Sequence, residues 1–383
     1  MGSSNLLSIS ALALLALPLV SSNVVPIIGP HHYDVAISAA ALTDTGRIDP
    51  FAKEGGPRKI MISTFTPVAN CRQKRLESYM PPATAAFEDD KFAAYGLPNG
   101  SFAALELETC KQVTSSSNRL AKKNSFPLVL FSGALGTSRL LYSGMLQSVA
   151  AAGYLVVSID HPYDSDVVEF PDGKVIQGTD ISDEDLESAL STRVDDIVYV
   201  YQQLGNQSFT KTAVPGVGRS CTKSLQNTAL IGHSFGGAAA AAAMLKIPSS
   251  RGGINLDGSM FEPVISSGLK QPFMLMGHEN KTQATDPSWK ATWPNLTGWK
   301  REFEVKGTAH YSFSDFPLIT EVLGLQEHLP QEVGQLLGTI DGSRMTNITV
   351  SYVKTFLDFV LKGKSGSAVD KIKGFPEVVL RDE

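Results

Sequence analysis

The segment 228–246 constrains the fold more than any other part of the sequence. A short apolar run leads into GHSFG at 232–236, and an alanine-rich stretch follows. Strand, sharp turn and helix in this order are the context in which G-x-S-x-G forms a nucleophile elbow. The glycines let strand and helix approach closely, so the serine hydroxyl projects at the end of the sheet. We predict that Ser234 is a catalytic nucleophile; the alternative is a glycine-rich turn into a packed helix.

Short β-rich runs alternate with helical stretches along the whole chain, which is typical of an α/β fold. Several runs, such as LVLF at 128–131, are continuously apolar, as strands buried on both faces are. We predict a mostly parallel, eight-stranded sheet with helices on both faces. The predicted strands are Tyr33–Ser38, Lys59–Phe65, Leu128–Phe131, Leu155–Ile159, Ala229–Ile231, Gly253–Leu256, Phe273–Met276 and Glu302–Val305. The predicted helices are Ser138–Ala152, Asp183–Gln203, Ser234–Lys246 and Thr346–Leu361.

The N-terminus carries an apolar run, Leu6–Val20, followed by small residues near Ser22. This run is too short to span a bilayer and has the length of a signal-peptide core, so we predict a signal peptide over residues 1–22. A buried N-terminal helix is the alternative. Residues 23–383 then form one domain with an insertion at about 66–127, in which we expect helices. The polar tail after Lys362 is expected to fray.

The charge and the glycosylation motifs narrow the setting in which the protein works. The formal net charge is −5, which argues against a nucleic-acid partner because such proteins carry basic patches. N-x-S/T sequons are compatible with a glycosylated surface and a secreted protein. They lie at Asn99, Asn206, Asn280, Asn295 and Asn347.

The chain has 3 cysteines, and an oxidising compartment allows two of them to pair. Cys71 and Cys110 flank one insertion and are our choice for the disulfide, which leaves Cys221 free. No Cys/His cluster has the spacing of a zinc site, so we predict no metal and no cofactor.

A serine nucleophile needs a histidine base that is oriented by an acid. In folds with this elbow the chain order is serine, acid, histidine, and three histidines follow Ser234. His310 lies in a loop after the eighth predicted strand, where the base is expected. His278 ends the seventh strand, which is too early, and His328 lies in an amphipathic stretch typical of a surface.

The acid is less constrained by the residues alone. Asp257 ends the sixth predicted strand and Glu279 the seventh, and the two remain nearly equal candidates; Asp286 is a further possibility. The oxyanion hole is expected to use the N–H of Phe235 and a second N–H from the loop 131–137. An ordinary strand-to-helix turn is the alternative for that loop.

Four motifs together resemble the secreted platelet-activating-factor acetylhydrolases, α/β-hydrolases of the lipoprotein-associated phospholipase A2 type. They are FSGALGTSR at 131–139, GHSFGG at 232–237, NLDGSMFEP at 255–263 and GTAHYSFSDFP at 307–317. The likeness runs from about Gly29 to Val360. It implies an α/β-hydrolase fold with Ser234 as nucleophile, His310 as base and Asp257 as acid. It also implies that Leu135 and Phe235 form the oxyanion hole.

This resemblance implies a secreted serine esterase that hydrolyses short-chain acyl esters of small molecules or lipids, such as acetylated or oxidised phospholipids. Transient contact with a lipid surface would fit such substrates. A cutinase-like polyester hydrolase or a general carboxylesterase is the first alternative. For it, the tryptophans Trp289, Trp293 and Trp299 would wall the cleft, although ordinary packing of these side chains is the simpler interpretation. A non-catalytic binding protein is a further alternative.

Overall fold

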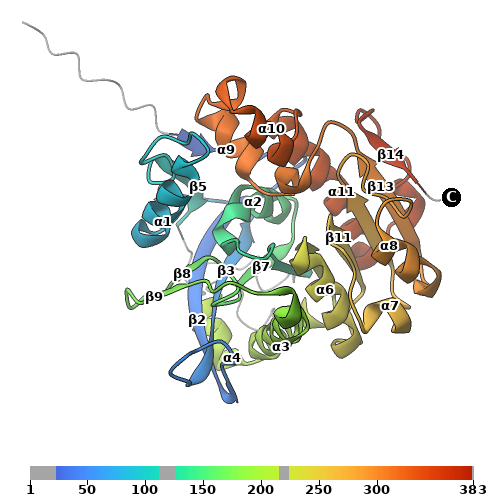
Figure 1. The fold of residues 1–383 in the computed structure, drawn as a ribbon, viewed down its shortest axis with the longest axis horizontal. Helices are drawn as coiled ribbons and strands as arrows, with labels where there is room; N and C mark the ends of the chain where they lie inside the picture. Colours follow the sequence, from blue (N-terminus) through green and yellow to red (C-terminus); the bar gives the residue numbers. More distant parts are fainter. Residues whose placement is uncertain (1–22, 112–125, 215–223, 382–383) are drawn as a thin grey trace, which may run out of the picture.

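A nine-stranded sheet runs through the centre of the protein, in a computed structural model that describes residues 23–111, 126–214 and 224–381 (Figure 1). The strand order is β14-β13-β12-β11-β10-β6-β7-β3-β2. The strands from β7 to β13 in this order pair in parallel, while β14, β3 and β2 pair antiparallel with their neighbours. The strand bounds are β2 Asp34–Ile48, β3 Pro57–Val68, β6 Leu128–Ser132, β7 Leu155–Asp160, β10 Thr228–His233, β11 Gly252–Leu256, β12 Phe273–Gly277, β13 Lys300–Val305 and β14 Val378–Leu380.

The predicted α/β class and mostly parallel sheet are confirmed, but the predicted number of eight strands is wrong. All eight predicted strands are present, and β14 is the ninth. All three residues of this strand are apolar, but a partly exposed run of three is too short to be identified as a strand from sequence. It pairs with β13, Phe303 opposite Leu380, within the tail that was expected to fray.

Apolar side chains alternate between the two faces of the sheet and form two cores. On β6, Val129 and Phe131 pack into one core, and Leu128 and Leu130 into the other. Helices α2, α9 and α11 cover the first face; α3 and α6 cover the second. In Figure 1 these two layers are seen with α9 and α10 at the top and α3 and α4 at the bottom. The expectation of helices on both faces is therefore confirmed.

The four predicted helices are present, with shifted ends. The stretch Ser138–Ala152 divides into a 3-10 turn, Arg139–Tyr142, and α2. The last of the four, α11, begins earlier than expected and ends at Lys362, where Gly363 adopts a left-handed conformation that stops the helix. The α-helices are α1 Pro82–Ala93, α2 Ser143–Ala151, α3 Leu186–Leu204, α4 Gln207–Ala213, α6 Phe235–Lys246, α7 Val264–Ser267, α8 Pro287–Thr292, α9 Phe316–Val322, α10 Gln331–Leu337 and α11 Gly342–Lys362.

In the described part of the segment 66–127, which we predict to be an insertion, there are strands as well as a helix. Besides α1, this segment holds β4 and β5, which join β1 in a small sheet of order β1-β5-β4. The sequence of β5, LELETC, begins with alternating apolar and polar residues, a pattern typical of a strand. Its leucines are buried and its glutamates are more exposed. These minor strands, with a separate hairpin, are β1 Asn23–Val25, β4 Lys74–Ser78, β5 Leu105–Cys110, β8 Val167–Glu169 and β9 Val175–Gln177.

A disulfide joins Cys71 to Cys110, across the turn before β4 and the end of β5. Two other features expected from the sequence, the signal peptide over residues 1–22 and the unpaired Cys221, lie outside the described residues. In the described part of the chain, every helix is too short or too polar to traverse a lipid bilayer.

Candidate active site

Ser234 lies at the turn between β10 and α6, at the carboxyl end of a central strand. Its backbone has φ 56° and ψ −127°, a strained conformation for a residue other than glycine. The glycines around it are required by space. A Cβ atom at Gly232 would lie 2.0 Å from the Gly236 carbonyl oxygen, and one at Gly236 would lie 2.1 Å from that of Ser132. The elbow geometry expected from GHSFG is therefore present.

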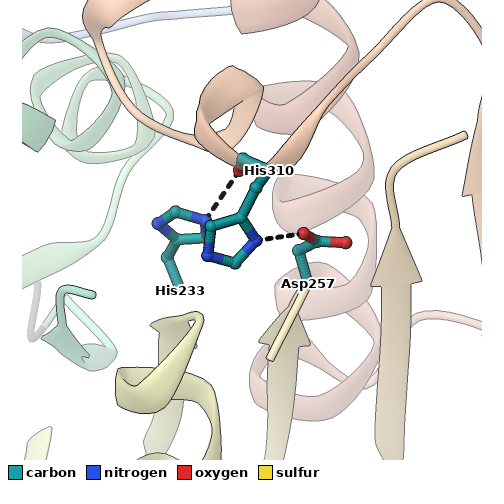
Figure 2. A group of neighbouring side chains, drawn as sticks. All are labelled: His233, Asp257 and His310. Atoms are coloured by element: carbon teal, nitrogen blue, oxygen red, sulfur yellow. Dashed lines mark hydrogen bonds and ion pairs between the residues drawn. The ribbon is translucent and has the colours of Figure 1, made fainter. Parts of the chain in front are cut away.

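His310 and Asp257 complete a hydrogen-bonded chain from the serine hydroxyl. Figure 2 shows the bond between His310 and Asp257. His310 begins a 3-10 turn after β13, and its Nε2 lies 2.9 Å from Ser234 Oγ. Its Nδ1 lies 2.5 Å from Oδ2 of Asp257, the residue directly after β11. Three loops at the same edge of the sheet thus bring together the three residues expected from the sequence.

Asp257 is held as a carboxylate. Only 1% of the residue is exposed, and burial alone would raise its pKa. Hydrogen bonds from His278 and His310 outweigh that effect and lower the pKa to about 2. A buried acid that stays ionised can orient an imidazole and stabilise its protonated form.

The other two acid candidates have different partners. Glu279 Oε2 accepts a hydrogen bond of 2.9 Å from the Gly307 N–H, so this side chain supports the loop that leads to His310. Asp286 caps α8 by accepting from the Ser288 N–H at 2.8 Å, and it pairs with Lys281 at 2.6 Å. Of the three carboxylates, Asp257 is the one that contacts His310 within the described residues.

A second histidine, His278, also binds the acid, and the sequence interpretation missed this role. Its Nδ1 lies 2.7 Å from Asp257 Oδ1, and its backbone N–H donates to the same oxygen at 2.8 Å. From the sequence, His278 is assessed only as a base and is excluded in that role. The available signal was that β11 and β12 are neighbours, with Leu256 opposite Met276, so residues just after both strands meet.

His233, the residue before the nucleophile, links the base to the loop after β6. Its Nε2 lies 2.9 Å from the His310 carbonyl oxygen, so this nitrogen donates (Figure 2). Its Nδ1 then accepts from the Tyr142 hydroxyl at 2.9 Å, and that hydroxyl accepts from the Ala134 N–H at 2.9 Å. Burial and the nearby His310 lower the pKa of His233 to about 3, so the ring is neutral and its tautomer is fixed.

The atoms of His233, Asp257 and His310 that could bind a metal all lie within 4.8 Å of one another. Their hydrogen bonds give the cluster another purpose. His233 Nε2 faces a carbonyl oxygen, and His310 Nδ1 faces the Asp257 carboxylate. His233 Nε2 and His310 Nδ1 therefore each carry a hydrogen, which is the arrangement of a proton relay rather than of metal ligands.

The residues expected for the oxyanion hole lie on two adjacent segments. Phe235 is the first residue of α6, and Leu135 lies in the loop after β6. The start of that loop touches the first turn of α6, since Gly236 is packed against the Ser132 and Gly133 carbonyls. Within the described residues, the Leu135 N–H has no hydrogen-bond partner. It is thus available to bind an oxyanion.

Comparisons with known proteins agree with this site. The chain matches the family described as "Platelet-activating factor acetylhydrolase, isoform II" over residues 98–173 and 221–367. A protein of Arthroderma benhamiae named "Probable 1-alkyl-2-acetylglycerophosphocholine esterase" is 31% identical over 363 residues, which cover 89% of each chain. The "Platelet-activating factor acetylhydrolase" of Cavia porcellus is 23% identical over 249 residues, and the alignment covers 54% of each chain.

A solved structure gives the same fold. The ferulic acid esterase from Streptomyces cinnamoneus superposes with a TM-score of 0.78 at 26% sequence identity, over 94% of this chain and 99% of that one. Sequence, fold and site therefore agree with the resemblance stated from the motifs. The chain belongs to the platelet-activating factor acetylhydrolase isoform II family of the α/β-hydrolase superfamily, and it is a carboxylic ester hydrolase.

Proposed function

We propose that this protein is a secreted serine esterase that removes short acyl groups, acetyl above all, from glycerophosphocholine lipids. The observation that carries the proposal is the continuous hydrogen-bonded chain from Ser234 through His310 to Asp257. The substrate class is supported by the names of the relatives, of which one is a probable 1-alkyl-2-acetylglycerophosphocholine esterase.

The arrangement supports a two-step reaction. His310 Nε2 takes the proton of the Ser234 hydroxyl as the oxygen attacks the ester carbonyl carbon. The carbonyl oxygen becomes an oxyanion that the Leu135 and Phe235 N–H groups bind, while Asp257 stabilises the imidazolium. The proton on His310 then passes to the leaving alcohol, and the ester bond breaks to leave an acyl-Ser234. Water, deprotonated by His310, attacks that acyl group and releases the acid and free serine.

An apolar cavity next to the loops that carry His310 and Leu135 supports a substrate with a hydrocarbon part. Its volume is about 150 Å³, and it borders Tyr311, the neighbour of His310, and Thr137 of the loop that carries Leu135. Its walls include Phe92, Phe102, Phe316 and Ile319. Such a cavity favours burial of alkyl chains over polar groups, at roughly 0.8 kcal/mol for each buried methylene.

Secretion and glycosylation belong to the same proposal. Among the sequons, Asn99, Asn206 and Asn280 are exposed, so a glycan can be attached there without displacing packed side chains. Asn295 instead donates from its amide nitrogen to the Ile265 carbonyl, and Asn347 is half-buried on α11. We expect glycans at the three exposed sites when a eukaryotic host secretes the full chain. Mass spectrometry with N-terminal sequencing tests this: a mature chain that retains Met1, or bears no glycan, would contradict it.

The catalytic assignment is tested by comparing wild type with Ser234→Ala on acetylated, long-chain and oxidised phosphocholine lipids. We expect wild type to prefer the short acyl group, and Ser234→Ala to lose hydrolysis by on the order of 10⁶-fold. Retained hydrolysis in Ser234→Ala would refute the role of Ser234. Equal hydrolysis of acetyl and long-chain lipids would refute the proposed acyl preference.

The second candidate function is an aromatic or polymeric ester hydrolase, and the likeness to a ferulic acid esterase favours it. The tryptophans give it little support. Trp289 is completely buried and donates to the Gly258 carbonyl at 2.7 Å, while Trp299 packs against Phe356 and Phe359. A direct comparison of methyl ferulate and polyester film with acetylated lipid separates the two functions, since the better substrate identifies the enzyme class.

A further inference from the structure

We propose that Arg193 positions the oxyanion hole: its guanidinium holds the carbonyls of the loop after β6 so that the Leu135 N–H faces the Ser234 oxyanion. This inference rests on the proposed function. It concerns a residue in the middle of α3, more than 40 residues from the nucleophile in sequence, that no motif indicated.

The contacts of Arg193 are concentrated on that loop. Its Nη1 donates to the Gly133 carbonyl oxygen at 2.5 Å, and its Nη2 donates to that of Ala134 at 3.1 Å. The remaining donors bind Ser132 Oγ at 3.2 Å and the carboxylate of Asp164. Arginine suits this task because its planar fork offers five donors in fixed directions.

Through the peptide bond between Ala134 and Leu135, the hydrogen bond from Arg193 to the Ala134 carbonyl sets the direction of the Leu135 N–H. The bond is planar and trans, so the Leu135 N–H points opposite to the Ala134 carbonyl. Arg193 and the Thr137 hydroxyl, at 2.8 Å, both donate to that carbonyl. The N–H is therefore turned away from α3 and left without a partner among the described residues.

The other half of the expected oxyanion hole is in contact with the same guanidinium. The Cζ atom of Arg193 lies 5.0 Å from the centre of the Phe235 ring, within the range of a cation–π interaction. Arg193 thus contacts the Ala134 carbonyl of the peptide that carries the Leu135 N–H, and it also contacts the side chain of Phe235. It fixes the Leu135 peptide by hydrogen bonds and supports the side chain of Phe235.

The burial of Arg193 indicates that this arrangement has a specific purpose. Its side chain is 1% exposed, on the helix face that also buries Leu190, Val194 and Ile197. A charged residue on such a face is unfavourable unless it is fully paired, and an apolar residue would pack there at less cost. The positive charge of Arg193 is neutralised by Asp164. The additional role of the guanidinium is therefore to bind the two loop carbonyls.

The test compares Arg193→Lys with Arg58→Lys. Arg58 is an equally buried arginine that pairs with Asp49 and Asp196 and donates to the Pro162 carbonyl. Unlike Arg193, within the described residues it makes no direct hydrogen bond to the Gly133 or Ala134 carbonyl, and it is connected to Ser132 only through Asp196 and His161. For 4-nitrophenyl acetate we expect Arg193→Lys to lower kcat by about 10- to 100-fold with KM within threefold, since loss of one oxyanion donor typically costs 10² to 10³. We expect Arg58→Lys to keep kcat within threefold.

A trifluoromethyl ketone supplies the readout that a merely structural role would not change. It forms a hemiketal oxyanion with Ser234, so its affinity should fall in Arg193→Lys by the same factor as kcat/KM. The double variant Arg193→Met/Asp164→Leu removes the buried charge pair as a whole, which favours folding, yet should show the same loss. Melting temperatures show whether each variant is folded at the temperature of the assay.

The inference is overturned if folded Arg193→Lys and the double variant keep kcat within threefold, or if kcat falls without any loss of affinity for the ketone. These results differ from failure of the proposed function. In that case Ser234→Ala would retain hydrolysis, whatever the Arg193 variants do.

Discussion

The two sides of Ser234 are built differently. On the oxyanion side, Arg193 and Asp164 have side chains only 1% and 2% exposed, and they hold the loop by charge-assisted hydrogen bonds. On the base side, the side chains of His310 and His278 are 36% and 32% exposed. Groups that face a developing charge are thus held rigidly and away from water, whereas groups that exchange protons remain accessible to water.

His233 and Tyr142 connect these two sides behind the nucleophile. The connection begins at the Ala134 N–H, passes through the Tyr142 hydroxyl and the His233 ring, and ends at the His310 carbonyl. Both rings are completely buried. A shift of the loop after β6 would therefore be transmitted to the backbone of the base.

The largest expected effect comes from removing the base itself. We predict that His310→Gln lowers kcat by on the order of 10⁶-fold, because no other group lies within hydrogen-bond distance of Ser234 Oγ in the described residues. Steady-state hydrolysis of 4-nitrophenyl acetate measures the loss. A fall of less than 100-fold would mean that another residue, such as His278, takes up the proton.

The second effect separates the two carboxylates that the sequence left level. Asp257→Asn should lower kcat by about 10⁴-fold, since an amide no longer stabilises the imidazolium and favours the wrong tautomer. Glu279→Gln is the matched control: this side chain contacts the Gly307 N–H rather than a histidine, so kcat should change by less than threefold. Equal losses in both variants would contradict the assignment of Asp257 as the acid.

The sequence predicted the parts of this site that depend on local pattern. The run GHSFG, the strand ends at Asp257 and Val305, and the apolar strands each carry their information within a few residues. Arg193 and Tyr142 could not be found in that way, because their roles depend on which helix face meets which loop. The sequence predicted a frayed tail where the structure has β14, and the cause is similar. The three residues of this strand gain their conformation only by pairing with β13.

The third effect tests the buried connection by its pH dependence. The folded-state pKa of His233 is about 3, below the value of about 6.5 for an unfolded histidine, so the folded state binds fewer protons. The contribution of His233 to the free energy of unfolding is complete above pH 6.5 and decreases as the pH falls towards 3. At pH 4 the loss is about 3 kcal/mol. Urea denaturation at several pH values should show a smaller decline in stability for His233→Gln than for wild type. Parallel declines would show that His233 does not titrate in this way.

The smallest expected effect concerns His278, and it tests the difference between the base side and the oxyanion side of Ser234. In His278→Gln the acid loses one imidazole donor but keeps the backbone N–H of residue 278 and the bond to His310, so its carboxylate stays oriented. We predict a fall in kcat of about 2- to 10-fold with KM unchanged, and no change for the exposed control His328→Gln. The half-exposed base side should thus tolerate replacement of a supporting side chain better than the buried oxyanion side does. If His278→Gln lowers kcat more than Arg193→Lys, burial does not mark the side on which positioning matters most.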